Sequence, residues 1–518
     1  MKRCPACNRV ETDDALAFCR ADGTRLVTGS LDSESSSTLM LSQPPRSAEL
    51  PTQQIQSGPS IAVLPFVNMS ADAENEYFCD GLAEELLNAL TKIENLKVAA
   101  RTSSFSFKGK NVNVDEIGRA LHVNSVLEGS VRKSGNRMRI TVQLVNAADG
   151  YHLWSERYDR EMQDIFEVQD EITLAVVAAL KLKLLGVERA AVLKRYTDNA
   201  EAYQLYLRGR FFFLKRTPEG FKRAIESFER AIKLDSEYAL AFAGLADCRT
   251  FVGFYELSAP AEIAESIREA AFKSLAIDDT LAEAHTAVAI FKSMYQWDFR
   301  RAQKEFDAAI RLNPKYALGH HLRSTNLIVL GLADEAIEAE RRAIELEPFA
   351  AIYNAALGWY LHLARRYDEA MKQSLKTIEL APNHFFAHWV LGLIYGQVGQ
   401  LNEAAAELQK AVTLTDGGQA IKADLGRIYA QMGKRDEALR TLDELMEQAK
   451  DTYVSAVNIA KIYLGLGDGE RVIEYLAKAC EERAVRLLWF IIDPALDSYR
   501  SDPRLQKMLR RVGLPLQR

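Results

Sequence analysis

A step of 34 residues repeats through the second half of the chain and constrains its fold more than any other feature. Gly358, Gly392 and Gly426 are each 34 residues apart. A fixed period of this length indicates stacked structural units rather than one closed core. Stacked helical units present a long concave surface, so the repeat favours a binding protein over an enzyme. The same step relates a second series of small residues, namely Ala302, Ala336, Ala370, Ala404 and Ala438.

The clearest copy of the repeat reads Leu-Gly-Leu-Ile-Tyr at 391–395, followed by Ala404 and Leu408. Small residues at the Gly and Ala positions let two antiparallel helices approach closely, and the large residue four positions after the alanine fills the gap between them. This pattern resembles the tetratricopeptide repeat (TPR) family. We count about eight such units in a repeat region of residues 197–490. The resemblance covers more than half of the chain.

The TPR resemblance implies a right-handed superhelix whose groove is lined by the first helix of each unit. Such a groove would hold a peptide or a helix of a protein partner. Trp359 and Trp389 stand out, because buried aromatic side chains dominate binding hot spots. The alternative is that these aromatic side chains only pack between neighbouring units. The groove positions that the resemblance implies are Phe291, Tyr295, His321, Thr325, Trp359, His362, Trp389, Gln397, Arg427, Asn458 and Lys461.

Residues 59–196 alternate strand and helix signals, which predicts a small α/β domain. Gly135 lies between two apolar runs and predicts a hairpin, because glycine supplies the positive φ that a tight turn needs. A long amphipathic helix is expected from Asp164 to Leu185. The neighbouring acids Glu84 and Glu85 are interpreted as helix acids on a solvated face.

Several motifs of this domain occur in the order and spacing of a known module. They are Ile-Ala-Val-Leu-Pro-Phe at 61–66, Asp-Gly-Leu-Ala-Glu-Glu-Leu at 80–86, Val-Leu-Glu-Gly-Ser-Val-Arg at 126–132 and Leu-Trp-Ser-Glu-Arg-Tyr at 153–158. Together they resemble the TolB-like (FlgO-like) module. Bacterial signalling proteins place this module before TPR arrays, after a CadC-type DNA-binding domain, a nucleotide cyclase domain or a kinase domain. In this chain a linker and a Cys-bearing segment stand in that place.

Residues 1–26 carry three cysteines in the spacing Cys4-x2-Cys7-x11-Cys19, followed by Asp22. Two knuckles of this kind, facing each other across a hairpin, can hold zinc tetrahedrally. The segment resembles a small zinc ribbon with Asp22 in place of the usual fourth cysteine. Because a carboxylate can ligate zinc, we expect one structural Zn held by these four residues. The alternative is a degenerate ribbon that folds without metal.

Composition and charge indicate a linker and narrow the range of expected partners and cellular compartments. Residues 27–58 are rich in Ser, Thr, Gln and Pro, which predicts a disordered linker, and 491–518 are expected to form a C-terminal tail. The net charge of −6 is small for 518 residues, so nucleic acid is not the expected partner. Residues 172–187 are apolar but too short to span a bilayer comfortably, and the first residues lack the apolar core of a secretory signal. We therefore expect a cytoplasmic protein.

Signatures of catalysis are weak. The eight histidines show no HExxH arrangement, and the glycines at 465–469 are explained by a turn between repeat helices. We expect an α+β multidomain protein: mainly a TPR superhelical solenoid, with a small α/β domain and a short N-terminal zinc-ribbon-like segment. The expected function is a non-enzymatic scaffold or adaptor in bacterial signalling or complex assembly. Two alternatives stay open: a regulatory component related to CadC-like or cyclase-linked proteins, and a nucleotide-binding enzyme with its site near Asp80 and Gly81 at a helix start.

Overall fold

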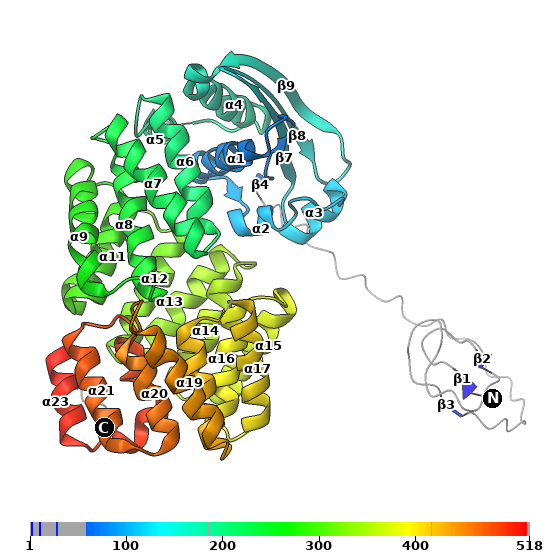
Figure 1. Cartoon of the computed structure of the whole chain (residues 1–518). Coiled ribbons are helices and arrows are strands. Elements are labelled where there is room, and N and C mark those ends of the chain that lie inside the picture. Colours follow the sequence, from blue (N-terminus) through cyan, green and yellow to red (C-terminus); the bar gives the residue numbers. More distant parts are fainter. Residues whose placement is uncertain are drawn as a thin grey trace, which may run out of the picture. The chain divides into compact units, whose positions relative to one another are not determined.

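The chain divides into two compact units, Met1–Gln56 and Ser57–Arg518. A computed structural model describes residues 2–3, 10–11, 27–28, 58–184, 186–415 and 417–514. In the first unit, three short strands pair in antiparallel fashion in the order β2-β1-β3. Their bounds are β1 (Lys2–Arg3), β2 (Val10–Glu11) and β3 (Val27–Thr28). The second unit contains an α/β part followed by an array of helix pairs (Figure 1).

The α/β part is built on one six-stranded sheet of order β6-β4-β7-β8-β9, with β5 paired to β7. β4 runs parallel to both β6 and β7, whereas β7, β8 and β9 form an antiparallel meander. The predicted hairpin is confirmed: Gly135 turns the chain between β7 and β8 with a φ of 58°. The strands are β4 (Ser60–Val63), β5 (Val67–Asn68), β6 (Lys97–Val98), β7 (Ser125–Ser134), β8 (Arg137–Asn146) and β9 (His152–Glu161).

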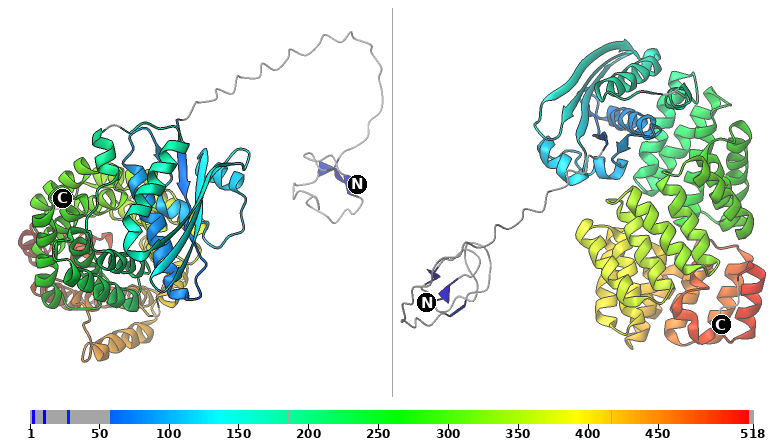
Figure 2. Two further views of the ribbon diagram at one scale, coloured as in Figure 1. Left: turned by 90° about the horizontal axis from the view of Figure 1, so that it is seen from above. Right: turned by 180° about the vertical axis from the view of Figure 1, so that it is seen from behind.

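Helices cover both faces of this sheet. α1 (Glu76–Thr91) and α4 (Ile165–Ala179) pack on one face, between the sheet and the helix array (Figure 2). α3 (Val114–Leu121) packs on the opposite face, where Ile117 contacts a small cluster with Ala62 and Val126. Two shorter helices, α2 (Arg101–Phe105) and α5 (Gly186–Val192), complete the part.

One helix is shorter than the sequence predicts. The expectation of a continuous helix from Asp164 to Leu185 is wrong, because α4 ends at Ala179. Lys181 then adopts a left-handed backbone conformation with a φ of 55°, which a continuing α-helix cannot contain. The chain turns here and resumes as α5 at Gly186.

Within 186–415 and 417–514, eight consecutive helix pairs follow one another, in agreement with the predicted number of repeats. They are α6 (Ala200–Leu214) with α7 (Pro218–Leu234), α8 (Ala239–Phe254) with α9 (Pro260–Ile277), α10 (Ala282–Phe291) with α11 (Phe299–Leu312), α12 (Ala317–Val329) with α13 (Ala333–Leu346), α14 (Ala351–Leu363) with α15 (Tyr367–Leu380), α16 (Phe385–Gln397) with α17 (Leu401–Leu414), α18 (Gln419–Gln431) with α19 (Arg435–Gln448), and α20 (Ala456–Leu466) with α21 (Gly469–Glu481). A short π-helical turn, Lys292–Gln296, interrupts the third pair.

The small residues of the repeat hold each pair together, as the sequence predicts. At Gly392, an added Cβ would lie 2.7 Å from the side chain of Leu408 on the paired helix, so only glycine allows this approach. Leu408 itself is fully buried, four residues after the equally buried Ala404. Of the glycines at 465–469, Gly467 ends α20 with a φ of 76°, which confirms the predicted turn. Gly465 instead lies within α20, where a Cβ would meet the Arg427 carbonyl oxygen at 2.5 Å, and Gly469 begins α21.

The chain after α21 folds back onto the array. A short helix, α22 (Leu487–Phe490), is followed by a 3₁₀ turn, Pro494–Tyr499, and by α23 (Pro503–Val512). Leu487, Leu488 and Ile491 are fully buried and belong to a core cluster that extends from Ile267 to Leu514. A second cluster extends from Ile61 to Val288, so the sheet and the first repeats share one core.

Candidate functional site

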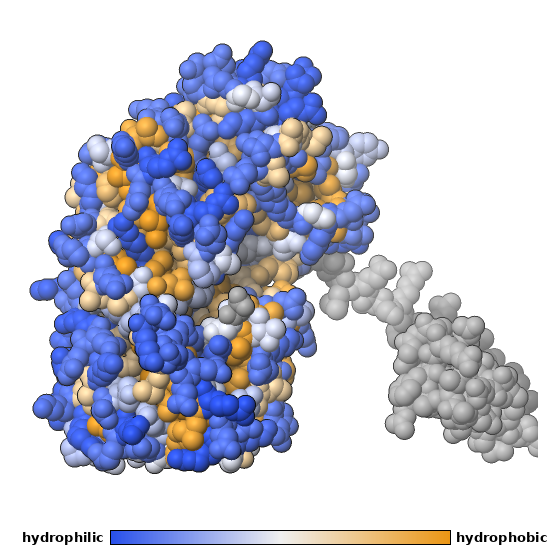
Figure 3. Space-filling model, in the orientation of Figure 1, coloured by the Kyte–Doolittle hydropathy of each residue, from blue (hydrophilic) through white to orange (hydrophobic). Residues whose placement is uncertain are grey.

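A cavity of about 1920 Å³ lies where the α/β part faces the inner helices of the array. Its wall combines residues of α1 and α2 with residues of the first helices of successive pairs, from α6 to α18. The surface is hollowed at this junction (Figure 3). Pockets for small molecules typically measure about 300–1000 Å³, so this cavity has room for a larger ligand.

A buried carboxylate organises the wall on the side of the α/β part. Glu84 of α1 accepts hydrogen bonds from Arg101 at 2.7 Å and from Arg210 of α6 at 2.8 Å. Burial alone would raise the pKa of Glu84, but the two guanidinium groups outweigh it and lower the pKa to about 2. The expectation that Glu84 is a solvated helix acid is therefore wrong, because α6 covers this face of α1.

A second contact joins the α/β part to the middle of the array. The Thr102 hydroxyl of α2 donates a hydrogen bond to Glu347, which precedes α14, at 3.0 Å. Burial raises the pKa of this carboxyl group. The cavity is therefore closed on this side by polar contacts between segments that are far apart in the sequence.

Aromatic side chains make up much of the remaining wall. Tyr255 and Phe385 lie with their ring centroids 6.4 Å apart, and the hydroxyl of Tyr316 is buried without a hydrogen-bond partner among the described residues. Rings of this kind offer a large apolar surface together with a polar handle, which suits a peptide better than a purely apolar ligand. The aromatic residues of the wall include Tyr203, Tyr206, Tyr255, Tyr316, Tyr353 and Phe385.

Arg216 occupies a special position on this wall. It lies in the turn between α6 and α7 with a φ of 52°. Its guanidinium carbon lies 4.1 Å from the ring centroid of Phe213 and 3.9 Å from that of Phe251. Burial lowers the pKa of Arg216, and its Nη1 atom is buried with no hydrogen-bond partner among the described residues. The guanidinium thus packs beside two rings that also contact each other, with part of its hydrogen-bonding capacity unused.

The groove positions predicted from the sequence divide into two groups. Four of them line this cavity: His321, Thr325, Trp359 and Trp389. The other seven lie outside its wall: Phe291, Tyr295, His362, Gln397, Arg427, Asn458 and Lys461. Asn458 donates a hydrogen bond to Glu256 at 2.8 Å, and Lys461 donates one to Asp424 at 2.8 Å.

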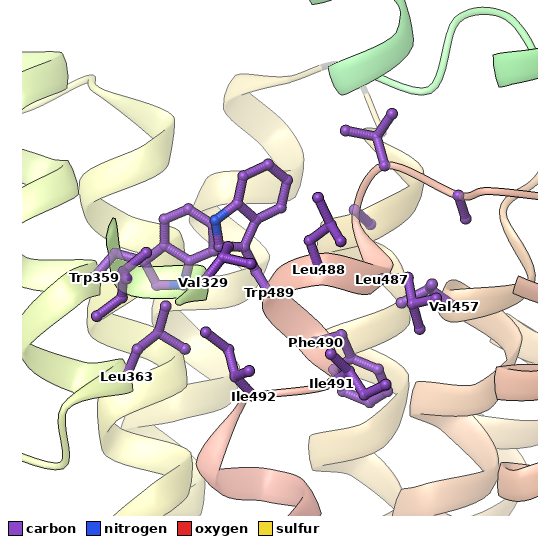
Figure 4. Close-up of a cluster of buried hydrophobic side chains, with 14 of the residues drawn as sticks. Val329, Trp359, Leu363, Val457, Leu487, Leu488, Trp489, Phe490, Ile491 and Ile492 are labelled. Carbon is purple, nitrogen blue, oxygen red and sulfur yellow. The ribbon is translucent and has the colours of Figure 1, made fainter. Parts of the chain in front are cut away.

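The chain itself fills the inner surface of the later repeats. Trp489 of α22 packs against Trp359 (Figure 4), with ring centroids 5.5 Å apart. The ring of Phe254 lies at the same distance from Trp489, 5.5 Å. The guanidinium of Arg486 lies 4.8 Å from the rings of both Phe254 and Trp389. Asn458 and Lys461 are buried, and their donor groups are engaged by Glu256 and Asp424, whereas Asn458 Oδ1 has no hydrogen-bond partner among the described residues. The open part of the concave surface is therefore the cavity next to the α/β part.

Sequence reasoning missed the residues that shape the cavity most. Glu84, Arg210 and Arg216 belong to α1, α6 and the turn after α6, outside the region where the repeat copies are clearest. No 34-residue spacing marks them. One sequence signal indicates that the groove continues toward the N-terminus. The first helix of a repeat prefers aromatic residues, and Tyr203 and Tyr206 follow this preference.

Two further predictions concern other parts of the chain. The predicted zinc ligands Cys4, Cys7, Cys19 and Asp22 lie outside the described residues. Within the described residues, no group of three or more His, Cys, Asp or Glu side chains is placed to hold a metal ion. Asp80 and Gly81 are not at a helix start: they lie within α1, where Asp80 bonds Lys108 and a Cβ at Gly81 would meet Leu207 at 2.9 Å. The expectation that Asp80 and Gly81 lie at a helix start, on which the predicted nucleotide site depended, is therefore wrong.

Of the helices in the described ranges, none combines the length and the apolar character needed to cross a membrane.

Comparisons with known proteins agree with this architecture. The family model of the second domain of HilA/YgeH-like transcriptional regulators matches residues 56–175, and models of the tetratricopeptide repeat match 321–385 and 397–462. A protein of Rhizobium meliloti (strain 1021) named "Putative adenylate cyclase 3" is 43% identical over 203 residues, which are 39% of this chain and 35% of that protein. This chain thus spans about a third of the length of that relative.

Solved structures with similar helix arrays have low sequence identity. Yeast Tom70 is 16% identical, with a TM-score of 0.40 over 67% of this chain and 82% of that one. YrrB, described as a TPR protein with an unusual peptide-binding site, is 22% identical, with a TM-score of 0.26 over 37% of this chain and 94% of that one. The family-model matches and the helix pairs together establish that the chain contains tetratricopeptide repeats, a fold that supports a protein-interaction scaffold.

Proposed function

We propose that this chain is a protein-interaction scaffold that binds an extended peptide segment of a partner protein in the cavity between the α/β part and the inner repeat helices. The observation that carries the proposal is the size and lining of that cavity: about 1920 Å³, with aromatic rings and charged side chains along its wall. His321, Thr325, Trp359 and Trp389, predicted as groove residues, belong to this wall. The α/β part supplies the opposite side of the same site.

The proposal is tested with two synthetic pools of random peptides, one with free and one with amidated C-termini. Each pool is passed over the immobilised whole chain, and retained peptides are identified by mass spectrometry. Dissociation constants of the retained peptides are then measured by fluorescence anisotropy. We expect Phe349→Ala and Phe385→Ala, both in the cavity wall, to weaken binding about tenfold, which is the loss of an aromatic contact at a binding site.

A matched control separates this effect from a general loss of apolar surface. Phe272 of α9 is as exposed as Phe349, at 37% of its surface, and lies outside the cavity wall. Phe272→Ala should therefore leave the dissociation constants unchanged. Failure of both pools to yield retained peptides would refute the proposed function, as would binding that is insensitive to both cavity variants.

A regulatory role is the second candidate. It is supported by the match of residues 56–175 to a domain of transcriptional regulators and by the relative named as an adenylate cyclase. In this role the chain would transmit the state of its peptide site to a separate output partner. Binding of the intact chain to a DNA fragment at physiological salt, measured by anisotropy, would favour direct regulation of transcription. A thermal shift with ATP or GTP would instead favour nucleotide chemistry.

A further inference from the structure

Arg216 differs from the other arginines of the cavity wall in having no acidic partner. Arg101 and Arg210 share Glu84, at 2.7 and 2.8 Å. The other two, Arg195 and Arg486, lie 2.7 Å from Asp170 and 3.8 Å from Glu256, respectively. Among the described residues, no carboxylate oxygen lies within the 4.0 Å of an ion pair from the guanidinium of Arg216.

The nearby acid Asp247 does not replace such a partner. It acts on Arg216 electrostatically from α8 but lies beyond ion-pair distance. Burial raises the pKa of Asp247 to about 7, although Arg210 and Arg216 oppose this rise. Near neutral pH, the carboxyl group of Asp247 is therefore uncharged in a large fraction of the protein. The positive charge of Arg216 is therefore not balanced at close range by the protein.

Arg216 lies in the cavity wall beside two aromatic rings and keeps an unpaired donor. The rings of Phe213 and Phe251, whose centroids are 5.5 Å apart, pack against adjacent sides of its guanidinium. Its Nη1 atom is buried without a hydrogen-bond partner among the described residues. Thr250, the residue before Phe251, also belongs to the cavity wall, and its buried hydroxyl has no hydrogen-bond partner in the part of the chain that the structure describes. A buried polar group without a partner is costly, and a charged one is more so.

We propose that the peptide bound in this cavity presents a carboxylate to Arg216, and that this contact selects acidic ligands. The inference rests on the proposed function, since it names the chemistry that the peptide must carry. A carboxylate accepts two parallel hydrogen bonds from the edge of one guanidinium. The carboxylate comes either from the C-terminus of the peptide or from an Asp or Glu side chain.

The two pools of random peptides distinguish these sources. If the terminal carboxylate is recognised, only the pool with free C-termini yields peptides whose retention requires Arg216. If a side chain is recognised, both pools yield peptides enriched in Asp or Glu at one position. In that case, replacing this residue of the peptide by Asn or Gln weakens binding at least tenfold.

Variants at Arg216 assign the effect to this residue. Arg216→Gln should weaken binding of the selected peptides at least tenfold, and Arg216→Lys should weaken it less, because the charge is kept and the forked geometry is lost. Lys222→Gln removes the same charge from an exposed residue of α7 that lies outside the cavity wall, and it should have little effect. Thermal unfolding of each variant shows whether it is folded.

The inference and the proposed function fail in different ways. Retained peptides without acidic enrichment in either pool, whose binding is equal in the wild type and in Arg216→Gln, would overturn the inference while the peptide site stands. An equal loss of binding in Arg216→Gln and Lys222→Gln would also overturn it, because the effect would then be a general one of charge. If neither pool binds, the proposed function itself fails.

Discussion

The indole rings of Trp489 and Trp359 pack against each other with centroids 5.5 Å apart and planes inclined by 43°. Trp359 belongs to an inner repeat helix, whereas Trp489 belongs to α22, after the last helix pair. The C-terminal part of the chain therefore covers the inner surface of the later repeats. Only the surface nearer the α/β part is left for an external ligand.

This packing predicts a large effect of truncating Trp489. Trp489→Ala should lower the free energy of unfolding by about 3–5 kcal/mol, because a buried aromatic side chain is removed and a void is left. Trp489→Phe should cost much less, since it keeps an aromatic ring and removes an indole N–H that has no partner among the described residues. Urea unfolding followed by circular dichroism measures both. Leu153→Ala, on an exposed side chain of β9, is the control, and an equally small effect of all three variants would contradict the packing role.

The contact of Glu84 with Arg101 and Arg210 predicts a dependence of stability on pH. The pKa of Glu84 is lowered in the folded state, so its contribution is present above the unfolded value of about 4.3 and is lost as the pH falls toward 2. Glu84→Gln should therefore lower the free energy of unfolding by about 3 kcal/mol at pH 7, with a much smaller difference near pH 2.5. Glu226→Gln, on an exposed face of α7, should show no such change. A difference that is constant with pH would argue against the ion pairs.

Asp247 predicts a pH dependence of the opposite sign. Burial raises its pKa to about 7, so the folded chain holds the proton more tightly than the unfolded chain does. Stability is then lost as the pH rises from about 4 through 7. The neutral variant Asp247→Asn should be more stable than the wild type at pH 8, by roughly 2–4 kcal/mol, and nearly equal to it at pH 4. Melting temperatures at the two pH values test this, and a variant less stable at pH 8 would show that Asp247 is needed in its charged form.

The zinc ribbon stays a prediction that a metal assay can decide. If Cys4, Cys7, Cys19 and Asp22 hold zinc, the purified whole chain should contain about one zinc ion, and Cys4→Ser/Cys7→Ser should contain none. Cys248→Ser, a change at a buried cysteine in the helix array, should leave the zinc content unchanged. A metal-free wild type after purification in zinc-containing buffer would favour the degenerate ribbon.

The features of the fold that depend on the spacing of nearby residues were predicted correctly from the sequence. The 34-residue step gave the number of helix pairs, because each small residue marks one close approach of two helices, as at Gly392 and Leu408. Gly135 marked the hairpin for an equally local reason. The end of α4 was missed because Lys181 adopts its positive φ where the chain must turn, and lysine carries no local signal for that conformation.

The site was predicted less well, because it depends on which surfaces meet in three dimensions. Glu84 has the spacing of a helix acid, and only the packing of α6 on α1 shows that it is buried. Trp359 and Trp389 were chosen for their aromatic character and do line the cavity, yet both also contact the segment around α22. Nothing in the repeat pattern indicates that residues after the last pair return to cover the groove.

The shared core of the sheet and the first repeats limits how such proteins can diversify. Leu207 of the first repeat lies against Gly81, and the core cluster that begins at Ile61 continues as far as Val288. Genetic recombination at the apparent junction near residue 196 would separate the two halves of one core. Exchange further along the array would also break contacts beyond neighbouring repeats, because Asn458 of the last pair bonds Glu256 after α8 and Trp489 packs on Phe254. The sheet and the first repeats therefore have to be inherited together, and the later repeats are tied to them by contacts across the inner surface.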